Sequence, residues 1–376
     1  MISDLSARHF ERILLIKPSA VGDVVHTIPL LVKLRARYPD ARIDWLITPE
    51  NADLVRLHPA LSRVVFFPRR EYARFGRSWS ATVGPLQLLA TIHQNRYDLV
   101  VDVHGQFRSA ALALASGAHT RIGFDRPARR ASRAEVKGLG VHGWFGAREG
   151  AWLAYTHRIG IPTLDVHAVD RYLWLAPMLG LDTDPPDFRI YLPPDATLRV
   201  DRLLESNGLR DKPLAVLVPG TIWETKHWRV AGFAEVGRHF VGRGLAVVLA
   251  GTSRDRERCE AIALACPGAC DLSGQTALAD LAELVRRASI CVTNDSGSMH
   301  LAVALERPVV SVFGPTDALR IGPYRRPFSV VRADVPCAPC NLRHLHDCHY
   351  GHICMEEVTA RMVTERAEAI LSEAPG

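Results

Sequence analysis

The stretch Cys291-Val-Thr-Asn-Asp-Ser-Gly-Ser-Met-His300, followed along the chain by Val309-Val-Ser-Val-Phe-Gly-Pro-Thr-Asp317, decides the fold of this protein. Its pattern predicts a strand, a polar turn, a short helix, a second strand and a second polar turn. Asn294, Asp295 and Ser296 can cap the helix, and the unpaired N–H groups at a helix start are a natural seat for phosphate. An ordinary capped helix in a βαβ unit explains the same pattern equally well.

Two series of alternating strands and helices fill the chain. Residues 12–17 and 41–47 have the character of buried strands and flank a helical stretch. Residues 214–218 and 245–250 flank another helical stretch in the same way. The sequence therefore predicts an α/β protein with two doubly wound, Rossmann-like domains, whose sheets present their carboxyl ends to a central cleft.

The length of 376 residues, of which 48% are hydrophobic, also favours two domains. A proline-rich stretch, with Pro185, Pro186, Pro193 and Pro194, is the best candidate for the connection between them. We expect the following division: an N-terminal domain at 1–184, a linker at 185–212, a C-terminal domain at 213–356, and a helix at 357–376 that packs back on the N-terminal domain.

The net charge of +6 favours anionic partners such as nucleotide sugars or phosphorylated lipids. Basic side chains concentrate between residues 121 and 150, where we expect a loop: Arg121, Arg126, Arg129, Arg130, Arg133 and Lys137. A solvated surface insertion explains this run equally well. No nucleic-acid-binding motif accompanies the charge, so nucleic acid is not an expected partner.

Nothing in the sequence indicates export or membrane insertion. Residues 1–12 lack the apolar core of a signal peptide, and no apolar run reaches the roughly 18 residues that a bilayer-spanning helix needs. We therefore expect a cytoplasmic protein.

Asp23 lies just beyond the first expected strand, next to Gly22 and ahead of a helix. A carboxylate at such a place can take a proton from an acceptor hydroxyl, provided that burial raises its pKa toward neutrality. The alternative is a helix N-cap, which is a common position for aspartate.

The turn Pro219-Gly-Thr-Ile-Trp-Glu-Thr-Lys-His-Trp228 follows the first strand of the second series. Gly220 and Thr221 would allow close backbone approach and a hydroxyl contact to phosphate, and Lys226 is a point charge suited to a pyrophosphate. The alternative for Lys226 is a surface lysine beside two packed tryptophans.

Two acidic positions are less distinctive. Asp255 follows the next expected strand, where an acidic side chain could hold ribose hydroxyls or cap a helix. Asp182-Thr-Asp184 matches a metal-binding pattern of some sugar transferases, but it stands at the proline-rich stretch with no strand before it. We assign it to the linker and treat the match as chance.

Cys337, Cys340, Cys348 and Cys354 form a cluster near the C-terminus. Such thiol density in a cytosolic protein favours metal over disulfides, and the four side chains could close a tetrahedral zinc or iron site with a structural role. The later spacings differ from those of a standard zinc ribbon, so reduced thiols in a loop are the alternative.

Three groups of residues stand in a distinctive order: Ile13-Leu-Leu-Ile-Lys-Pro-Ser-Ala-Val-Gly-Asp-Val-Val-His-Thr-Ile-Pro29, then Lys226-His-Trp228, then Asn294-Asp-Ser-Gly-Ser-Met-His-Leu-Ala302 with Phe313-Gly-Pro-Thr-Asp317. In this order they resemble the heptosyltransferases of glycosyltransferase family 9. The resemblance covers most of the chain and implies the GT-B fold. It also implies transfer of ADP-activated L-glycero-D-manno-heptose to the inner core of lipopolysaccharide.

The resemblance implies roles for individual residues. Asp23 matches the proposed general base of the family, and Lys226 matches its pyrophosphate-binding lysine. Ser296 replaces a threonine seen in some members, and Asp255 aligns less securely than the others. The residues that we expect to bind substrate are Gly22, Thr221, Asp255, Asp295, Ser296, Gly297 and His300. The cysteine-rich tail resembles that of some later-acting members, and related transferases that glycosylate autotransporter proteins carry an iron-binding cysteine cluster.

The implied reaction is inverting transfer from ADP-heptose without a catalytic cofactor, because Lys226 and the helix start near Ser298 would stabilise the leaving pyrophosphate. The implied partner is an anionic lipopolysaccharide-core acceptor, with peripheral contact to the inner face of the membrane. Three alternatives stay open: a protein acceptor such as an autotransporter, another nucleotide sugar or acceptor, and a non-catalytic nucleotide-sugar-binding protein.

Overall fold

The computed structural model describes residues 4–72, 76, 77, 79–126, 146–163, 165–182 and 184–373. These residues form two compact units, which divide between residues 191 and 192. The division falls inside the stretch expected to be a linker. Helix α8 (Pro194–Ser206), which was part of that stretch, belongs to the second unit.

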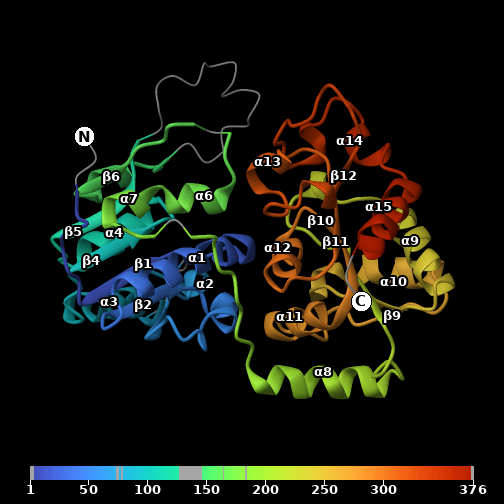
Figure 1. Cartoon of the computed structure of the whole chain (residues 1–376), viewed down its shortest axis with the longest axis horizontal. Helices are drawn as coiled ribbons and strands as arrows, with labels where there is room; N and C mark the ends of the chain where they lie inside the picture. The colour runs from blue at the N-terminus through green and yellow to red at the C-terminus, as the bar shows by residue number, and fades with distance from the viewer. Residues whose placement is uncertain are drawn as a thin grey trace. The chain divides into compact units, whose positions relative to one another are not determined.

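The described part of the first unit has a six-stranded parallel sheet in the order β3-β2-β1-β4-β5-β6 (Figure 1). Its strands are β1 (Arg12–Ile16), β2 (Arg42–Ile47), β3 (Arg63–Phe66), β4 (Leu99–Asp102), β5 (Thr120–Phe124) and β6 (His157–Ile159). Its helices are α1 (Val21–Arg37), α2 (Arg69–Tyr72), α3 (Trp79–Gln94), α4 (Phe107–Ala115), α6 (Ala168–Tyr172) and α7 (Ala176–Leu179). The central strands β1 and β4 are fully buried beyond Arg12, because both faces of a parallel sheet carry helices.

The second unit repeats this architecture with a six-stranded parallel sheet in the order β12-β11-β10-β7-β8-β9. Its strands are β7 (Leu214–Val218), β8 (Ala246–Leu249), β9 (Cys270–Asp271), β10 (Ala288–Asn294), β11 (Val309–Phe313) and β12 (Val330–Arg332). Besides α8, its helices are α9 (Val230–Gly242), α10 (Arg256–Ala265), α11 (Leu278–Arg287), α12 (Gly297–Ala304), α13 (Ala318–Ile321), α14 (Ile353–Glu356) and α15 (Ala360–Glu373).

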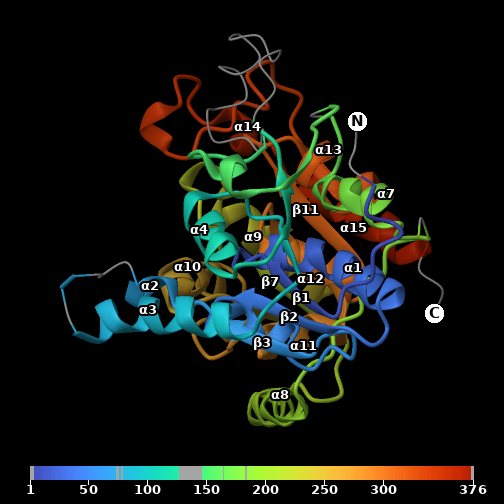
Figure 2. The ribbon, with the colours of Figure 1, turned by 90° about the vertical axis from the view of Figure 1, so that its left-hand side faces the viewer.

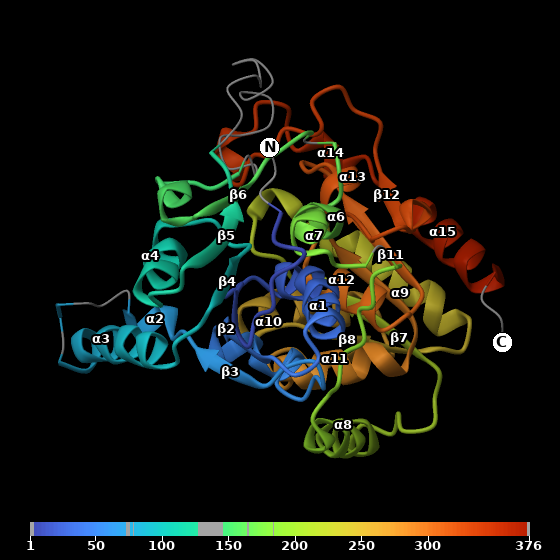
Figure 3. The same ribbon diagram turned by 60° about the vertical axis from the view of Figure 1, so that its left-hand side comes forward.

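Helices cover both faces of each sheet. In the first unit, α3 and α4 lie on one side of the strands and α1, α6 and α7 on the other (Figures 2 and 3). In the second unit one apolar core joins the sheet to α9, α10 and α15, and another joins it to α8, α11 and α12. These layers confirm the expected doubly wound α/β class for each unit.

The C-terminal helix differs from the expectation. It packs against α9 and β11 of the second unit rather than on the N-terminal domain (Figure 3). The reason is its apolar face, since Val363, Ala367 and Ile370 are buried in the core of the second unit together with strand residues of its sheet.

Part of the expected basic loop is regular structure. Arg121 lies in β5, and its guanidinium donates hydrogen bonds to the main-chain carbonyls of Ala154, at 2.6 Å, and Ala118. Arg121 therefore stabilises the fold and does not contribute to a free basic surface. Arg129, Arg130, Arg133 and Lys137 lie outside the described residues.

The Asp182 to Asp184 segment is tied to α1. The ammonium of Lys33 forms an ion pair with Asp182 and donates to the main-chain carbonyl of Asp184 at 2.7 Å. This contact uses the Asp182 carboxylate as a structural anchor. Within the described ranges, no helix combines the length and apolar character that crossing a bilayer requires.

The position of α15 predicts a contrast between two alanines of that helix. Ala367→Asp should lower the free energy of unfolding by several kcal/mol, because Ala367 is fully buried and a carboxylate there would have no partner. Ala369→Asp places the same side chain at an exposed position of the same helix, so its cost should stay near the helix-propensity difference of about 0.7 kcal/mol. Urea unfolding of both variants measures this, and equal losses would contradict the packing.

Candidate active site

The strand order sets the place of the candidate site residues in both units. In each sheet the order reverses between two neighbouring central strands, β1 and β4 in the first and β7 and β10 in the second. Loops that leave the carboxyl ends of such strands diverge to opposite faces, which opens a crevice where doubly wound sheets bind ligands. Asp23 follows β1, Lys226 follows β7, and Asp295 follows β10. The topology thus brings the expected residues of each unit to its own switch point.

Asp23 lies in the first turn of α1, which begins at Val21 and so includes Gly22. Its carboxylate accepts a hydrogen bond from the Tyr172 hydroxyl at 2.7 Å and one from the Ala20 N–H at 3.2 Å. The Lys17 ammonium lies 3.3 Å away, and the Asp23 side chain is 25% exposed. The contact to Ala20 is a helix-capping contact, and the catalytic role of this side chain stays a prediction.

The expectation that burial raises the pKa of Asp23 toward neutrality is wrong. Burial alone would raise this pKa, but the Lys17 charge and the hydrogen bonds from Tyr172 and the Ala20 N–H together outweigh it and hold the pKa below its usual range. The carboxylate is therefore ionised at neutral pH and ready to accept a proton or a hydrogen bond.

Lys17, directly after β1, has the largest effect of any charged group on the pKa of Asp23. Its side chain is fully buried, its ammonium donates to the Val103 carbonyl at 3.4 Å and lies 4.8 Å from the centre of the Tyr172 ring. Burial lowers the pKa of Lys17 to about 8, although Asp23 opposes this shift. Burial and the Lys17 charge lower the pKa of His104 to about 3, so His104 is neutral beside the pair.

A hollow next to this pair carries positive charge. Pro18, Ser19 and His104 line it together with the guanidinium-bearing side chains of Arg69 and Arg108. These arginines offer bidentate donors to carboxylate or phosphate groups. The hollow has room for about one water molecule, so it offers positive charge beside the pair and no space for a ligand of its own.

In the second unit Lys226 is held by a buried carboxylate. Its ammonium lies 2.6 Å from an Asp295 oxygen and 4.4 Å from the centre of the Trp223 ring. The same Asp295 oxygen accepts a hydrogen bond from the Thr316 hydroxyl at 2.5 Å, and Asp295 is 4% exposed. An ammonium has three donors, so the pair fixes Lys226 in place and leaves donors for an anion.

The start of α12 lies directly after Asp295. Ser296 is the N-cap, Gly297 is the first helical residue, and the hydroxyls of Ser296 and Ser298 are 2.6 Å apart. His300 is buried within the helix. The Thr221 hydroxyl donates to the Asp295 carbonyl at 3.3 Å, which joins the loop after β7 to the same place. The free N–H groups and partial positive charge of this helix start therefore lie beside Lys226.

Asn294, expected as a cap, has a structural role. Its amide donates to the Pro219 carbonyl at 2.8 Å and accepts from the Trp228 N–H at 3.1 Å. These bonds fix the turn that carries Lys226 to the end of β10.

Asp255 packs beneath the loop after β7. Its carboxylate accepts hydrogen bonds from the Thr252 N–H and hydroxyl, each at 2.8 Å. A Cβ at Gly220 would come within 2.6 Å of both carboxylate oxygens, so only glycine fits there. Its expected contact to ribose stays a prediction.

The four clustered cysteines lie near one another without closing a metal site. Burial, followed by the neighbouring thiols of Cys340, Cys337 and Cys348, raises the pKa of Cys354 to about 12. No three of these sulfurs lie within 4.8 Å of one another, whereas Zn–S bonds of about 2.3 Å in a tetrahedral site place sulfurs about 3.8 Å apart. The thiols would have to turn toward a common centre, so the structural zinc or iron ion stays a prediction.

Comparison with known proteins matches these features. The model of glycosyltransferase family 9 (heptosyltransferase) matches residues 86–139 and 134–347, which is more than half of the chain. The chain belongs to glycosyltransferase family 9. Lipopolysaccharide heptosyltransferase 1 of Pseudomonas aeruginosa is 31% identical to it over 335 residues, which cover 88% of this chain and 86% of the relative.

Solved structures agree with this assignment. Escherichia coli heptosyltransferase WaaC with ADP aligns with a TM-score of 0.72 and 26% identity, covering 96% of this chain and 99% of that one. A family 9 glycosyltransferase of Veillonella parvula aligns with a TM-score of 0.77 at 20% identity and 99% coverage of both chains, a likeness of fold. The GT-B class expected from the sequence is confirmed, and so is the class of enzyme, a glycosyltransferase.

Sequence reasoning missed several residues of these clusters. Lys17 could have been recognised from the sequence, because a lysine directly after a buried apolar strand needs a partner for its charge. Thr316 belongs to the stretch Phe313–Asp317 on which the resemblance rests, but no role was assigned to it. Tyr172 carried no signal, because it lies 149 positions from Asp23 along the chain and only the fold brings the two together.

The buried charge of Lys17 predicts a pH-dependent stability. Its pKa is about 8 in the folded protein and near 10.5 when unperturbed, so the unfolded chain binds more protons between these values. The contribution of Lys17 to stability therefore rises as pH rises from 8 to 10.5. Lys17→Met has no group that titrates in this range. The free energy of unfolding of the wild type should therefore rise relative to that of Lys17→Met by up to about 3 kcal/mol, at about 1.4 kcal/mol per pKa unit.

Urea unfolding at stepped pH measures this gain. Lys212→Met, at an exposed position, is the matched control and should follow the wild type throughout. Parallel curves for Lys17→Met and the wild type would contradict the burial of a charged lysine.

Proposed function

We propose that this family 9 glycosyltransferase moves heptose from ADP-L-glycero-D-manno-heptose to the inner core of lipopolysaccharide, with inversion. The observation that carries the proposal is the Lys226–Asp295 pair beside the amino end of α12. It supports a pyrophosphate site in a chain whose relatives include a lipopolysaccharide heptosyltransferase and a heptosyltransferase solved with ADP.

The second unit would hold the donor. The Lys226 ammonium and the N–H groups of α12 oppose the negative charge that grows on the ADP pyrophosphate as the bond to the sugar breaks. Asp295 and Thr316 fix this arrangement before the reaction, so little reorganisation is needed. Because these groups supply positive charge, we propose that the transfer requires no divalent metal.

The first unit would activate the acceptor. Asp23 takes the proton of an acceptor hydroxyl while that oxygen bonds to the anomeric carbon and ADP leaves. Its lowered pKa keeps it charged and able to accept, and the Tyr172 hydroxyl and Lys17 hold it in one orientation. The role is that of a general base acting as the nucleophile bonds.

The positive charge that Arg69 and Arg108 supply beside the Lys17–Asp23 pair supports an anionic acceptor. Lipopolysaccharide core sugars with carboxylate or phosphate groups have the matching charge. Such an acceptor is lipid-anchored, so we propose that the enzyme acts in the cytoplasm in peripheral contact with the inner membrane.

Asp23→Asn tests the base. The amide cannot accept the proton, so kcat/KM should fall by about a hundredfold or more, while ADP affinity stays that of the wild type because the donor groups are in the second unit. Transfer to lipopolysaccharide-core acceptor is followed by mass spectrometry and ADP binding by calorimetry. Asp211→Asn, exposed and remote from these clusters, is the control. Normal turnover by Asp23→Asn would rule out the base.

Lys226→Met tests the pyrophosphate site. Loss of a charged hydrogen bond worth about 1.5–3 kcal/mol should weaken ADP binding by about tenfold to a hundredfold and slow turnover. The change also leaves Asp295 buried without its cation, so the double variant Lys226→Met/Asp295→Asn is the control. It should recover stability in urea without recovering ADP affinity. Recovered affinity would show that Lys226 acts only by neutralising Asp295.

A further inference from the structure

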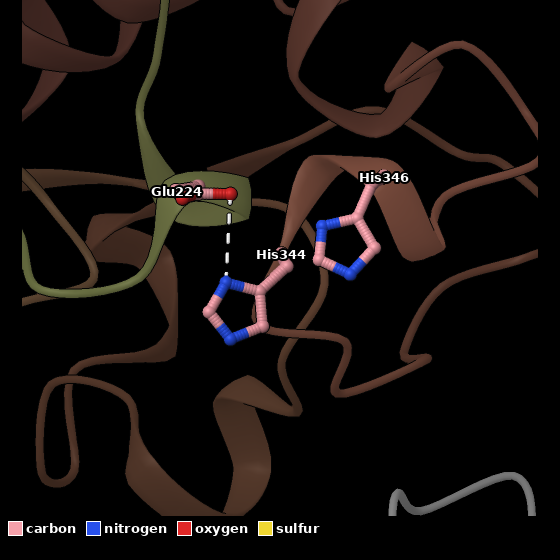
Figure 4. Close-up of side chains that lie close together, drawn as sticks. All are labelled: Glu224, His344 and His346. Atoms are coloured by element: carbon pink, nitrogen blue, oxygen red, sulfur yellow. Dashed lines mark ion pairs between the residues drawn. The ribbon is translucent and has the colours of Figure 1, made fainter.

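A group of side chains that none of the described sites includes gathers on the surface of the second unit. Glu224, from the short helix η4 (Glu224–Lys226), lies beside His344 and His346 (Figure 4). Among the described residues, this is the one set of three His, Cys, Asp or Glu side chains whose ligand atoms all lie within 4.8 Å of one another. Two imidazoles and a carboxylate are a donor set that suits zinc.

The spacing of the donors matches a metal site. His344 Nδ1 lies 3.6 Å from a Glu224 oxygen, close to the roughly 3.3 Å between ligands of a tetrahedral zinc with bonds near 2.0–2.1 Å. The rings of His344 and His346 stack with centroids 5.3 Å apart, which brings both imidazoles to the same side (Figure 4). An ion pair between Glu224 and a protonated His344 explains the 3.6 Å contact alone, but it leaves the position of His346 without a reason.

Asp347 supplies a further feature of metal sites. Its carboxylate lies 3.3 Å from Nε2 of His346. A small turn of the ring that let Nε2–H donate to this carboxylate would leave the lone pair of the imidazole on Nδ1. A carboxylate that orients a ligand imidazole in this way is typical of metal-binding histidines.

Main-chain hydrogen bonds hold the donors in place. The Leu345 N–H donates to the Glu224 carboxylate at 3.1 Å, between the two histidines. The Thr225 hydroxyl donates to the Leu342 carbonyl at 2.6 Å, and His352 Nε2 donates to the Thr225 carbonyl at 2.6 Å. Segment 341–352 is thus ordered against η4, and little conformational freedom would be lost when an ion binds.

We propose that Glu224, His344 and His346 bind a divalent transition-metal ion, Zn²⁺ in the first instance, separate from the cysteine cluster. The three side chains are 55%, 56% and 76% exposed, so water completes the coordination. The ion cross-links segment 341–352 to the turn that carries Lys226. This site does not depend on the proposed transferase function.

Metal titration of the full chain tests the site. Reduced, chelator-treated protein is titrated with Zn²⁺ by calorimetry and with Co²⁺ by absorbance, where a thiolate ligand adds a sulfur-to-cobalt charge-transfer band. We expect a binding event that produces no such band, in addition to any binding by the cysteines. Glu224→Gln and His344→Ala/His346→Ala should each weaken it by about tenfold or more, and Asp347→Asn by about tenfold to a hundredfold.

His349→Ala is the matched control, because His349 is an exposed histidine of the same segment outside the set. It should leave the event unchanged. A Cys340→Ser/Cys348→Ser variant should also keep it. The Co²⁺ absorbance of the wild type minus that of His344→Ala/His346→Ala isolates the contribution of the histidine site while all the cysteines are kept. Binding only with the thiolate band, binding that survives loss of both histidines, or no binding at all would overturn the proposal.

Discussion

The order of strands in two parallel sheets is the constraint on which the rest of this structure depends. Helices on both faces bury the central strands, so main-chain groups and side chains can emerge only where those strands end. At the carboxyl ends of β1 and β4, and again of β7 and β10, the chain turns to opposite faces. The proposed base Asp23 and the Lys226–Asp295 pair all stand on a loop or a helix start at one of these two places. A change in sheet order would separate them even if every side chain were kept.

Each switch point also has a lysine paired with an aspartate, but the two residues exchange roles between the units. In the first unit Lys17 is fully buried and supports Asp23, which is the more exposed partner and the proposed base. In the second unit Asp295 is the more buried partner and supports Lys226, the proposed anion ligand. Burying the supporting charge costs desolvation energy, but it leaves the working charge oriented and the more accessible of the two. The same device thus presents a carboxylate in one unit and an ammonium in the other.

The sequence predicted the strands well, because a buried parallel strand is a short apolar run between polar turns, as in residues 214–218. It also predicted the positions of Asp23 and Lys226, since turns after such strands are where ligands bind. The sequence did not predict features that depend on contacts between residues far apart in the chain. The pKa of Asp23 depends in part on Tyr172, which is remote in sequence. The apolar face of α15 could be recognised from the sequence, but the surface against which it packs could not. The proximity of Glu224 to His344 and His346 likewise became visible only in the folded structure.

The turn that carries Lys226 shows how packing and function connect. Trp228 is fully buried, and its indole donates to the Val358 carbonyl at 2.9 Å just before α15. Its main-chain N–H is held by Asn294, so this end of the turn is fixed by the core and by β10. At the other end Glu224 is exposed, and its carboxylate and the hydroxyl of the buried Thr225 bond to segment 341–352. An ion at Glu224 would therefore add a further link between this end of the turn and segment 341–352. The position of the Lys226 charge then depends on both ends of one short turn, one end held by apolar packing and the other by polar side chains and the proposed metal.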